Sequence, residues 1–271
     1  MKETPNKKFK AIRKSAFISF KHCNKQFEYF YNDPKYWEYG NNKDEPDEKK
    51  RRGNEFHAAT EVFFDKMTGR TFTKTWNQGE LRSYLPKTDD KILSRYFKWF
   101  ADIEVKRYNE LENKQDFLPL ANELKVYMKD LVIDRTGHID RIDVIPGTKN
   151  LRVVEYKAGA SYDMEKPDRV TSMNAEIGWY VQILKAIKEY PEYKITEWMV
   201  MNPALEKIWI NKISPISLKA VENTYSKMID MIIKGLKFPK NVGPLCDYCP
   251  YLEECDPYYE EENVVNFGKA I

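Results

Sequence analysis

Apolar residues recur with a helical period in the first part of the chain. Apolar side chains three or four positions apart predict amphipathic helices over residues 17–33, 56–69 and about 90–112. The segment YGNNKDEPDEKKRRGNE (39–55) is polar, carries charges of both signs and contains Pro46 and Gly53. This composition predicts an exposed loop between the first two helices.

The period changes to two in the middle of the chain. Residues 122–159 alternate apolar and polar side chains in short runs, separated by the turn sequences DRTG and PGTKN, which predicts a meander of antiparallel strands. Helical spacing returns over about 172–190, strand candidates follow at 195–203 and 206–213, and residues 215–236 predict a long helix. This order of elements predicts an α/β (or α+β) core with helical and Cys-rich additions at its two ends.

Composition and charge narrow the class of protein. The 271 residues are 42% hydrophobic and 32% charged, which is typical of a globular chain with a heavily ionised surface. The net charge of only +3 argues against a histone-like, charge-driven binder, but it leaves room for a locally basic groove. The lysine-rich segment 7–14 is interpreted as a solvated N-terminal arm.

Two sequence features bear on location. No stretch reaches the roughly 20 apolar residues of a membrane span, and residues 1–10 lack the apolar core of a signal peptide. We therefore expect no membrane contact and a cytoplasmic (intracellular) location. In that reducing compartment the four cysteines are not expected to form disulfides.

The stretch LRVVEYKAG (151–159) combines strand character with charged residues. Side chains of a strand alternate between faces, so Val153, Glu155 and Lys157 share one face and Tyr156 points to the other. An edge strand exposed to water would explain two neighbouring charges on one face. An active site would explain them equally well.

Asp140 lies in the preceding segment, GHIDRID, upstream of a turn at Pro146-Gly147. A hairpin there brings Asp140 and Glu155 onto adjacent strands, within reach of one cation. Carboxylate oxygens, a backbone carbonyl and water suit Mg²⁺ or Mn²⁺. Lys157 lies one pleat along from Glu155, roughly 7 Å away, where its ammonium could orient a water and offset charge on a phosphate. An ordinary ion pair is the alternative interpretation.

The cysteines form a second candidate site. Three have the spacing Cys246-x2-Cys249-x5-Cys255, and the fourth, Cys23, lies far upstream. A Cys-x2-Cys pair with a third cysteine nearby is typical of a metal site, which holds either Zn²⁺ or an iron–sulfur cluster. The residues alone leave both open.

Taken in order, these motifs resemble the PD-(D/E)XK nuclease superfamily, whose core is a mixed, restriction-endonuclease-like sheet flanked by helices. A Gly-x-x-Asp turn before a strand ending in Glu-x-Lys is its signature. Other motifs resemble the RecB-like iron–sulfur branch, which includes the CRISPR-associated Cas-four exonucleases. GNEFHAATE resembles its His-containing helix, Glu123 matches the Glu of its upstream strand, and EIGWY matches Gln-x-x-x-Tyr at Tyr180 but has Glu176 in place of Gln. The resemblance runs from about Ser19 to Cys255.

The resemblance assigns roles to individual residues. Four groups are expected to hold Mn²⁺ or Mg²⁺: His57, Asp140, Glu155 and the backbone carbonyl of Tyr156. Four residues are expected to take part in catalysis: Asp140, Glu155, Lys157 and Tyr180. Four cysteines are expected to hold a [4Fe-4S] cluster that ties the chain ends together: Cys23, Cys246, Cys249 and Cys255.

The resemblance also implies an organisation and an activity. We expect one nuclease domain over residues 1–271, a nuclease core in 115–215, and an iron–sulfur module in 17–33 plus 240–257. The implied activity is a metal-dependent exonuclease acting on DNA ends in CRISPR adaptation, recombination and repair, or viral DNA processing, with proteins of these pathways as partners. Two alternatives are a non-catalytic DNA-binding adaptor on this fold and a zinc-bound scaffold whose Glu155 and Lys157 form a plain ion pair.

Overall fold

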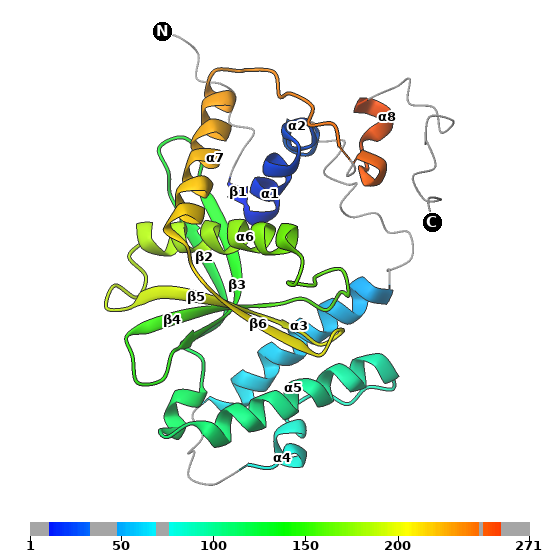
Figure 1. The fold of residues 1–271 in the computed structure, drawn as a ribbon, viewed down its shortest axis with the longest axis vertical. Coiled ribbons are helices and arrows are strands. Elements are labelled where there is room, and N and C mark those ends of the chain that lie inside the picture. Colours follow the sequence, from blue (N-terminus) through cyan, green and yellow to red (C-terminus); the bar gives the residue numbers. More distant parts are fainter. Residues whose placement is uncertain (1–10, 33–47, 69–75, 244–245, 256–271) are drawn as a thin grey trace.

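A six-stranded mixed β-sheet lies between two layers of helices in the computed structural model (Figure 1). The structure describes residues 11–32, 48–68, 76–243 and 246–255. The strands are β1 (Ile12–Arg13), β2 (Ala121–Met128), β3 (Arg135–Val144), β4 (Asn150–Tyr156), β5 (Lys194–Asn202) and β6 (Lys207–Lys212). The predicted fold class, a mixed sheet flanked by helices, is confirmed.

The sheet follows the order β1-β3-β4-β5-β6, and β2 also pairs with β3. Strands β2, β3 and β4 pair antiparallel, so the predicted meander is confirmed. β1 pairs parallel to β3, β5 pairs parallel to β4, and β6 pairs antiparallel to β5. Parallel neighbours need a crossover connection, and α6 (Pro167–Ala186) supplies the one between β4 and β5.

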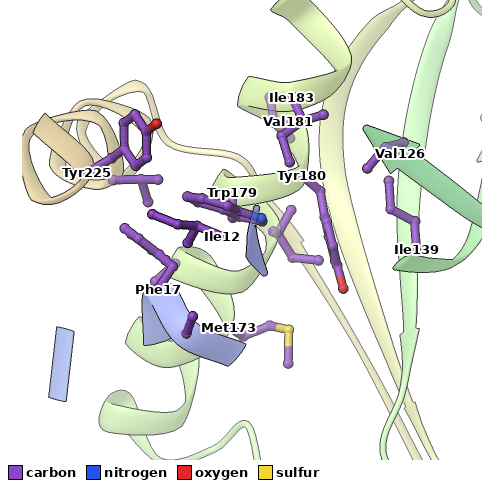
Figure 2. Close-up of a cluster of buried hydrophobic side chains, with 14 of the residues drawn as sticks. Ile12, Phe17, Val126, Ile139, Met173, Trp179, Tyr180, Val181, Ile183 and Tyr225 are labelled. Atoms are coloured by element: carbon purple, nitrogen blue, oxygen red, sulfur yellow. The ribbon is translucent and has the colours of Figure 1, made fainter. Parts of the chain in front are cut away.

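One face of the sheet is covered by α1 (Lys14–His22), α2 (Asn24–Asn32), α6 and α7 (Pro215–Ile233). Phe17, Trp179 and Tyr225 come from three of these helices and are buried together. Phe17 and Trp179 stack with ring centroids 4.9 Å apart. Figure 2 shows this cluster, with Tyr180 between α6 and the strands that carry Val126 and Ile139. Aromatic burial on this scale fixes α1 and α6 against the sheet.

The other face is covered by α3 (Glu48–Met67), α4 (Gln78–Arg82), α5 (Lys91–Glu110) and the 3-10 helix η3 (Lys114–Phe117). Asp90 caps α5 by accepting hydrogen bonds from the first amides of the helix. Phe56 and Phe100, one from each long helix, pack edge-on against Tyr156 of β4, at centroid distances of 5.7 and 6.2 Å. The two long helices are thereby held against the strand that carries the Glu-x-Lys motif.

A buried ion network crosses this second core. Arg141 donates to Asp143 through Nε (2.8 Å) and Nη2 (2.7 Å), to Glu104 (2.9 Å) and to the Tyr156 hydroxyl (3.2 Å). Burial alone would raise the pKa of Asp143, but the attraction of Arg141 outweighs it and the pKa is lowered. The guanidinium therefore keeps this carboxylate ionised inside the core.

The N-terminal segment differs from the prediction in two ways. The helix predicted over 17–33 is interrupted because Cys23 has an extended backbone (φ −151°, ψ 116°) that separates α1 from α2. The supposed solvated arm includes β1, whose Ile12 is fully buried. Residues 7–10 of that arm lie outside the described residues.

The predicted loop 39–55 is helical in its second part. Residues 48–55 form the first two turns of α3, and Arg51 pairs there with Glu55 four residues later (2.6 Å). These turns have no stripe of apolar residues, so the helical period of apolar positions does not predict them. Residues 39–47 lie outside the described residues.

The C-terminal segment folds against α2. It contains the short helices η4 (Cys246–Tyr248) and α8 (Leu252–Cys255). Tyr29 of α2 donates to the carbonyl of Glu254 (2.9 Å), and its ring stacks on Tyr251 at 5.6 Å. The two segments predicted to form one module, 17–33 and 240–257, therefore contact each other; residues 33, 244, 245, 256 and 257 lie outside the described residues. None of the helices described is long and apolar enough to cross a bilayer.

Candidate active site

Strands β3 and β4 separate where the acidic residues lie. The last residues paired through the backbone are Arg141 and Val154. Beyond this pair the amide of Tyr156 donates to the carboxylate of Asp140 instead (2.7 Å). Asp140 and Glu155 stand at this fork and are 6% and 2% exposed. The hairpin therefore brings both carboxylates to one place, as the sequence predicts.

Two lysines hold Glu155. The ammonium of Lys157, directly after β4, lies 2.8 Å from Glu155 Oε1 and 3.1 Å from Glu176 Oε2 of α6. Lys14, the first residue of α1, makes the same two contacts at 2.7 and 3.1 Å. Two ammonium groups and two carboxylates thus form a closed ring of ion pairs.

His57 projects from α3 towards the fork. Its Nε2 lies 3.1 Å from the carbonyl oxygen of Tyr156, and its Nδ1 lies 3.5 Å from Asp140 Oδ1. The neighbouring Phe56 anchors this turn of α3 because its buried ring packs on Tyr156. His57 therefore contacts two of the other groups predicted to hold a metal ion, Asp140 and the carbonyl of Tyr156, and Glu155 is next to them on β4.

Glu123 of β2 adds a further carboxylate. Its ligand atom and those of His57 and Asp140 all lie within 4.8 Å of one another. One Glu123 oxygen lies 2.7 Å from His138 Nε2, while Oε1 is buried and has no hydrogen-bond partner among the described residues. The backbone of Glu123 is in the left-handed region (φ 50°), which is strained for a side-chain-bearing residue and often marks a functional site. Burial, above all, raises the pKa of Glu123 to about 7.

Tyr180 closes the site on the α6 side. Its hydroxyl donates to the carbonyl of His138 (2.5 Å), and the Lys14 ammonium lies 5.1 Å from the centre of its ring. Gly137 lies against the same ring: a Cβ at this position would come within 2.8 Å of Tyr180 Cε1. Glycine is therefore needed here for close approach rather than for an unusual backbone angle.

The electrostatics distinguish the two carboxylates at the fork. Burial raises the pKa of Asp140, and repulsion from Glu155 raises it further. Burial also acts to raise the pKa of Glu155, but the attraction of Lys14 and Lys157 outweighs it and the pKa is lowered. The pKa of His57 is lowered, chiefly by burial, so its ring is neutral at pH 7 and can offer a lone pair to a metal ion.

These groups line one open cleft of about 1160 Å³. Its wall includes six basic side chains: Arg13, Lys14, Lys49, Lys50, Lys125 and Lys157. A basic wall around an acidic floor suits a polyanion that binds together with a cation.

The donor set fits a hard divalent cation. Carboxylate oxygens, a backbone carbonyl and an imidazole nitrogen are all ligands that Mn²⁺ accepts, and the oxygen donors suit Mg²⁺. Glu155 Oε2, like Glu123 Oε1, is buried without a hydrogen-bond partner among the described residues. Unpaired buried oxygens are costly, and a cation at the fork would satisfy them.

The four cysteines gather where the C-terminal segment meets α1 and α2. The sulfur of Cys23 accepts from the amide of Asn241 (3.5 Å), and the amide of Cys249 donates to the carbonyl of Cys246 (2.9 Å). The pKa of the Cys249 thiol is raised first by burial and further by the charges of Cys23, Cys255 and Cys246. The sulfur of Cys246 lies 4.0 Å from the carbonyl oxygen of Asn241, so the backbone of Asn241 contacts both Cys23 and Cys246.

Two residues at the centre were not among the predicted site residues. Lys14 lies in the supposed arm, and Glu176 was noted only as a departure from the family pattern. The structure supplies one signal for Lys14: it is the first residue of α1 and follows Arg13 at the N-cap, although the helix dipole disfavours cations at an N-terminus. Residues that break a local rule in this way are often functional.

Comparisons with known proteins found a matching family model and similar solved structures. A sequence model described as the PD-(D/E)XK nuclease superfamily matches residues 15–256. A candidate exonuclease from Eubacterium rectale has a crystal structure similar to this one, with 14% identity and a TM-score of 0.48, over 89% of this chain and 87% of that chain. The protein SSO0001 is 12% identical with a TM-score of 0.44, over 93% of this chain and 88% of that one. No curated protein sequence matches the chain.

Proposed function

The chain belongs to the PD-(D/E)XK nuclease superfamily, and we propose that it is a divalent-metal-dependent exonuclease that hydrolyses phosphodiester bonds at DNA ends. The main support is the fork between β3 and β4, where Asp140, Glu155 and Lys157 meet His57 from a distant helix. Metal-assisted hydrolysis needs these chemical groups, and here they share one basic cleft.

The side chains have separate roles in the proposed reaction. The metal ligands would be His57, Asp140, Glu155 and the carbonyl of Tyr156, with Glu123 as a further carboxylate. A divalent ion held there supplies a Lewis acid for the phosphate and lowers the pKa of a water. Lys157 donates a hydrogen bond to the attacking water or to a phosphate oxygen, and its charge offsets the negative charge of the transition state. Tyr180 packs beside Lys14 and holds its position.

We also propose that the chain belongs to the RecB-like iron–sulfur branch and that its four cysteines hold a structural [4Fe-4S] cluster. The support is their spacing together with the contacts between α2 and the C-terminal segment. Folding of the two segments would then depend on the cluster. Protein purified without oxygen should be brown and absorb near ~400 nm. A colourless protein with one zinc ion per chain would show that the cysteines hold zinc and not an iron–sulfur cluster.

The resemblance of the motifs to the RecB-like branch also guides the proposed biology. We place the activity inside the cell, in CRISPR adaptation, recombination and repair, or viral DNA processing. Proteins of these pathways would be the partners.

Cleavage of end-labelled DNA tests the proposed activity. Wild-type protein should shorten single- or double-stranded DNA from an end with Mn²⁺ or Mg²⁺, and EDTA should stop the reaction. Asp140→Asn and Lys157→Met should each lower the rate at saturating DNA by about 10²–10⁴-fold. Lys212→Met, an exposed lysine at the end of β6 and outside the lining of this cleft, is the matched control and should keep the rate within about threefold.

Three outcomes would count against the proposal. DNA binding without cleavage by the wild type would favour the adaptor alternative. Equal rates for wild type and Asp140→Asn would place catalysis elsewhere. If internal fragments appear before nucleotides are released from the ends, the activity is that of an endonuclease.

A further inference from the structure

Lys14 and Glu176 add one ammonium and one carboxylate to the proposed metal centre, and both come from outside the β3–β4 hairpin. Lys14 belongs to α1 and Glu176 to α6. Lys14 lies 2.7 Å from Glu155 and 3.1 Å from Glu176, and its side chain is 24% exposed. The lysine therefore sits between two carboxylates at the edge of the site.

The fold fixes the position of Lys14 from both sides. On its N-terminal side, β1 pairs with β3, and the amide of Ile12 donates to the carbonyl of Asp134 (2.7 Å). On its C-terminal side, Ala16 and Phe17 are fully buried in the core shown in Figure 2. Lys14 is therefore not a mobile surface lysine that happens to reach an acidic residue.

The charges of the centre match one divalent ion. Its carboxylates are Glu123, Asp140, Glu155 and Glu176, and its ammonium groups are Lys14 and Lys157. With all of them ionised and His57 neutral, the centre has two negative charges in excess. Without Lys14 the excess would be three, and Glu155 and Glu176 would share only one counterion.

We propose that Lys14 occupies, between Glu155 and Glu176, the place that a second divalent cation would take, and that it thereby limits the centre to one metal ion. Facing carboxylates are the usual ligands of Mn²⁺ and Mg²⁺. Here two ammonium groups bridge them instead: Lys157, which the proposed reaction uses, and Lys14, which it does not. Lys14 is a positioning residue in this proposal, which rests on the proposed metal-dependent function.

The test of the proposal is the number of Mn²⁺ ions that the protein binds without DNA. This number is measured by calorimetry and by the electron paramagnetic resonance signal of the Mn²⁺ that stays free. Wild type should bind one ion per chain and Lys14→Met two. Glu176→Gln should bind one ion roughly tenfold more weakly, because the centre loses one negative charge. The double variant Lys14→Met/Glu176→Gln restores the original net charge and should return to one ion with nearly wild-type affinity.

Lys21→Met is the matched control. Lys21 lies on the same helix and reaches α6 through the carbonyl of Thr171 (3.2 Å), without touching the carboxylates of the ring. It should bind one Mn²⁺ with wild-type affinity. Thermal unfolding in EDTA shows which variants fold. If Lys14→Met does not fold, Mn²⁺ binding by Glu176→Gln and by the double variant tests the role of Lys14.

The outcomes separate this inference from the proposed function. A wild type that binds no Mn²⁺ overturns both. One ion with unchanged affinity in Lys14→Met, or unchanged affinity in Glu176→Gln, overturns the role of Lys14 alone. Slower cleavage by Lys14→Met with an unchanged Mn²⁺ count would assign Lys14 to phosphate binding and would also overturn the proposal.

Discussion

Replacing Arg141 with methionine would remove the guanidinium on which a buried carboxylate depends. Arg141 is fully buried and holds Asp143, which is 5% exposed, through two hydrogen bonds of 2.7 and 2.8 Å. Breaking a buried ion pair costs about 3–5 kcal/mol because the remaining charge is neither hydrated nor paired. Glu104 keeps a second partner, Arg107 at 2.7 Å, so we expect the lower end, about 3 kcal/mol. In a chain of this size that loss lowers Tm by roughly 6–12 °C.

The loss should depend on pH in a defined direction. In the wild type the pKa of Asp143 is lowered, because the attraction of Arg141 outweighs burial. The pair therefore stabilises the fold above the unfolded-state pKa of about 3.9, and this contribution disappears as the pH falls through the folded-state pKa. In the variant burial is opposed only by the weaker attraction of Arg107 and Arg152, so the folded-state pKa rises, and protonation relieves the penalty as the pH falls. The difference in stability between the two proteins is therefore largest near neutral pH.

Urea unfolding of wild type and Arg141→Met at pH 7 and pH 4.5 measures both effects. Arg95→Met is the control, because Arg95 pairs with Glu206 at the surface, where the two side chains are 56% and 52% exposed. Such a pair contributes about 0–1 kcal/mol. A loss below 1 kcal/mol for Arg141→Met, or a loss that grows at the lower pH, would refute the reasoning.

Two further changes test the walls of the site. Gly137→Ala should destabilise the fold by about 1–3 kcal/mol and slow cleavage, because the new methyl would lie 2.8 Å from Tyr180 Cε1 and 3.3 Å from Val126 Cγ2. A variant as stable in urea as the wild type would contradict this close packing. The Mn²⁺ affinity of the wild type should rise as the pH passes about 7, because Glu123, whose pKa burial raises to about 7, must lose its proton to bind. Glu123→Gln should bind more weakly than wild type at pH 8 and similarly at pH 6 by calorimetry; parallel pH profiles would exclude Glu123 as a ligand.

The hairpin and its motif were predictable because the signals are local. Alternation placed Glu155 and Lys157 on one face of β4, and the turn at Pro146-Gly147 brought Asp140 opposite them, as the structure has them. His57 could be named only through the resemblance, since nothing local links its helix to the fork. The roles in metal binding and catalysis remain predictions, to be decided by the experiments above.

Other features depend on contacts between distant segments, and local patterns do not carry them. The sequence IDRIDV has the look of a strand with one face in water, yet Arg141 and Asp143 are buried because Glu104 of a distant helix joins them. Strand β1 has two residues, too few for any alternation to be detected, and only its pairing with β3 brings Lys14 into the site. Charge pairing in the first case and strand pairing in the second override the local pattern.

The position of a bound ion tests the central claim most directly. We would soak crystals of the intact protein in Mn²⁺ and locate manganese by its anomalous scattering. We predict one peak per chain, at the fork between His57, Asp140, Glu155 and the carbonyl of Tyr156, with Lys14 still between Glu155 and Glu176. No peak at the fork, or a second peak between Glu155 and Glu176, would contradict this account of the centre.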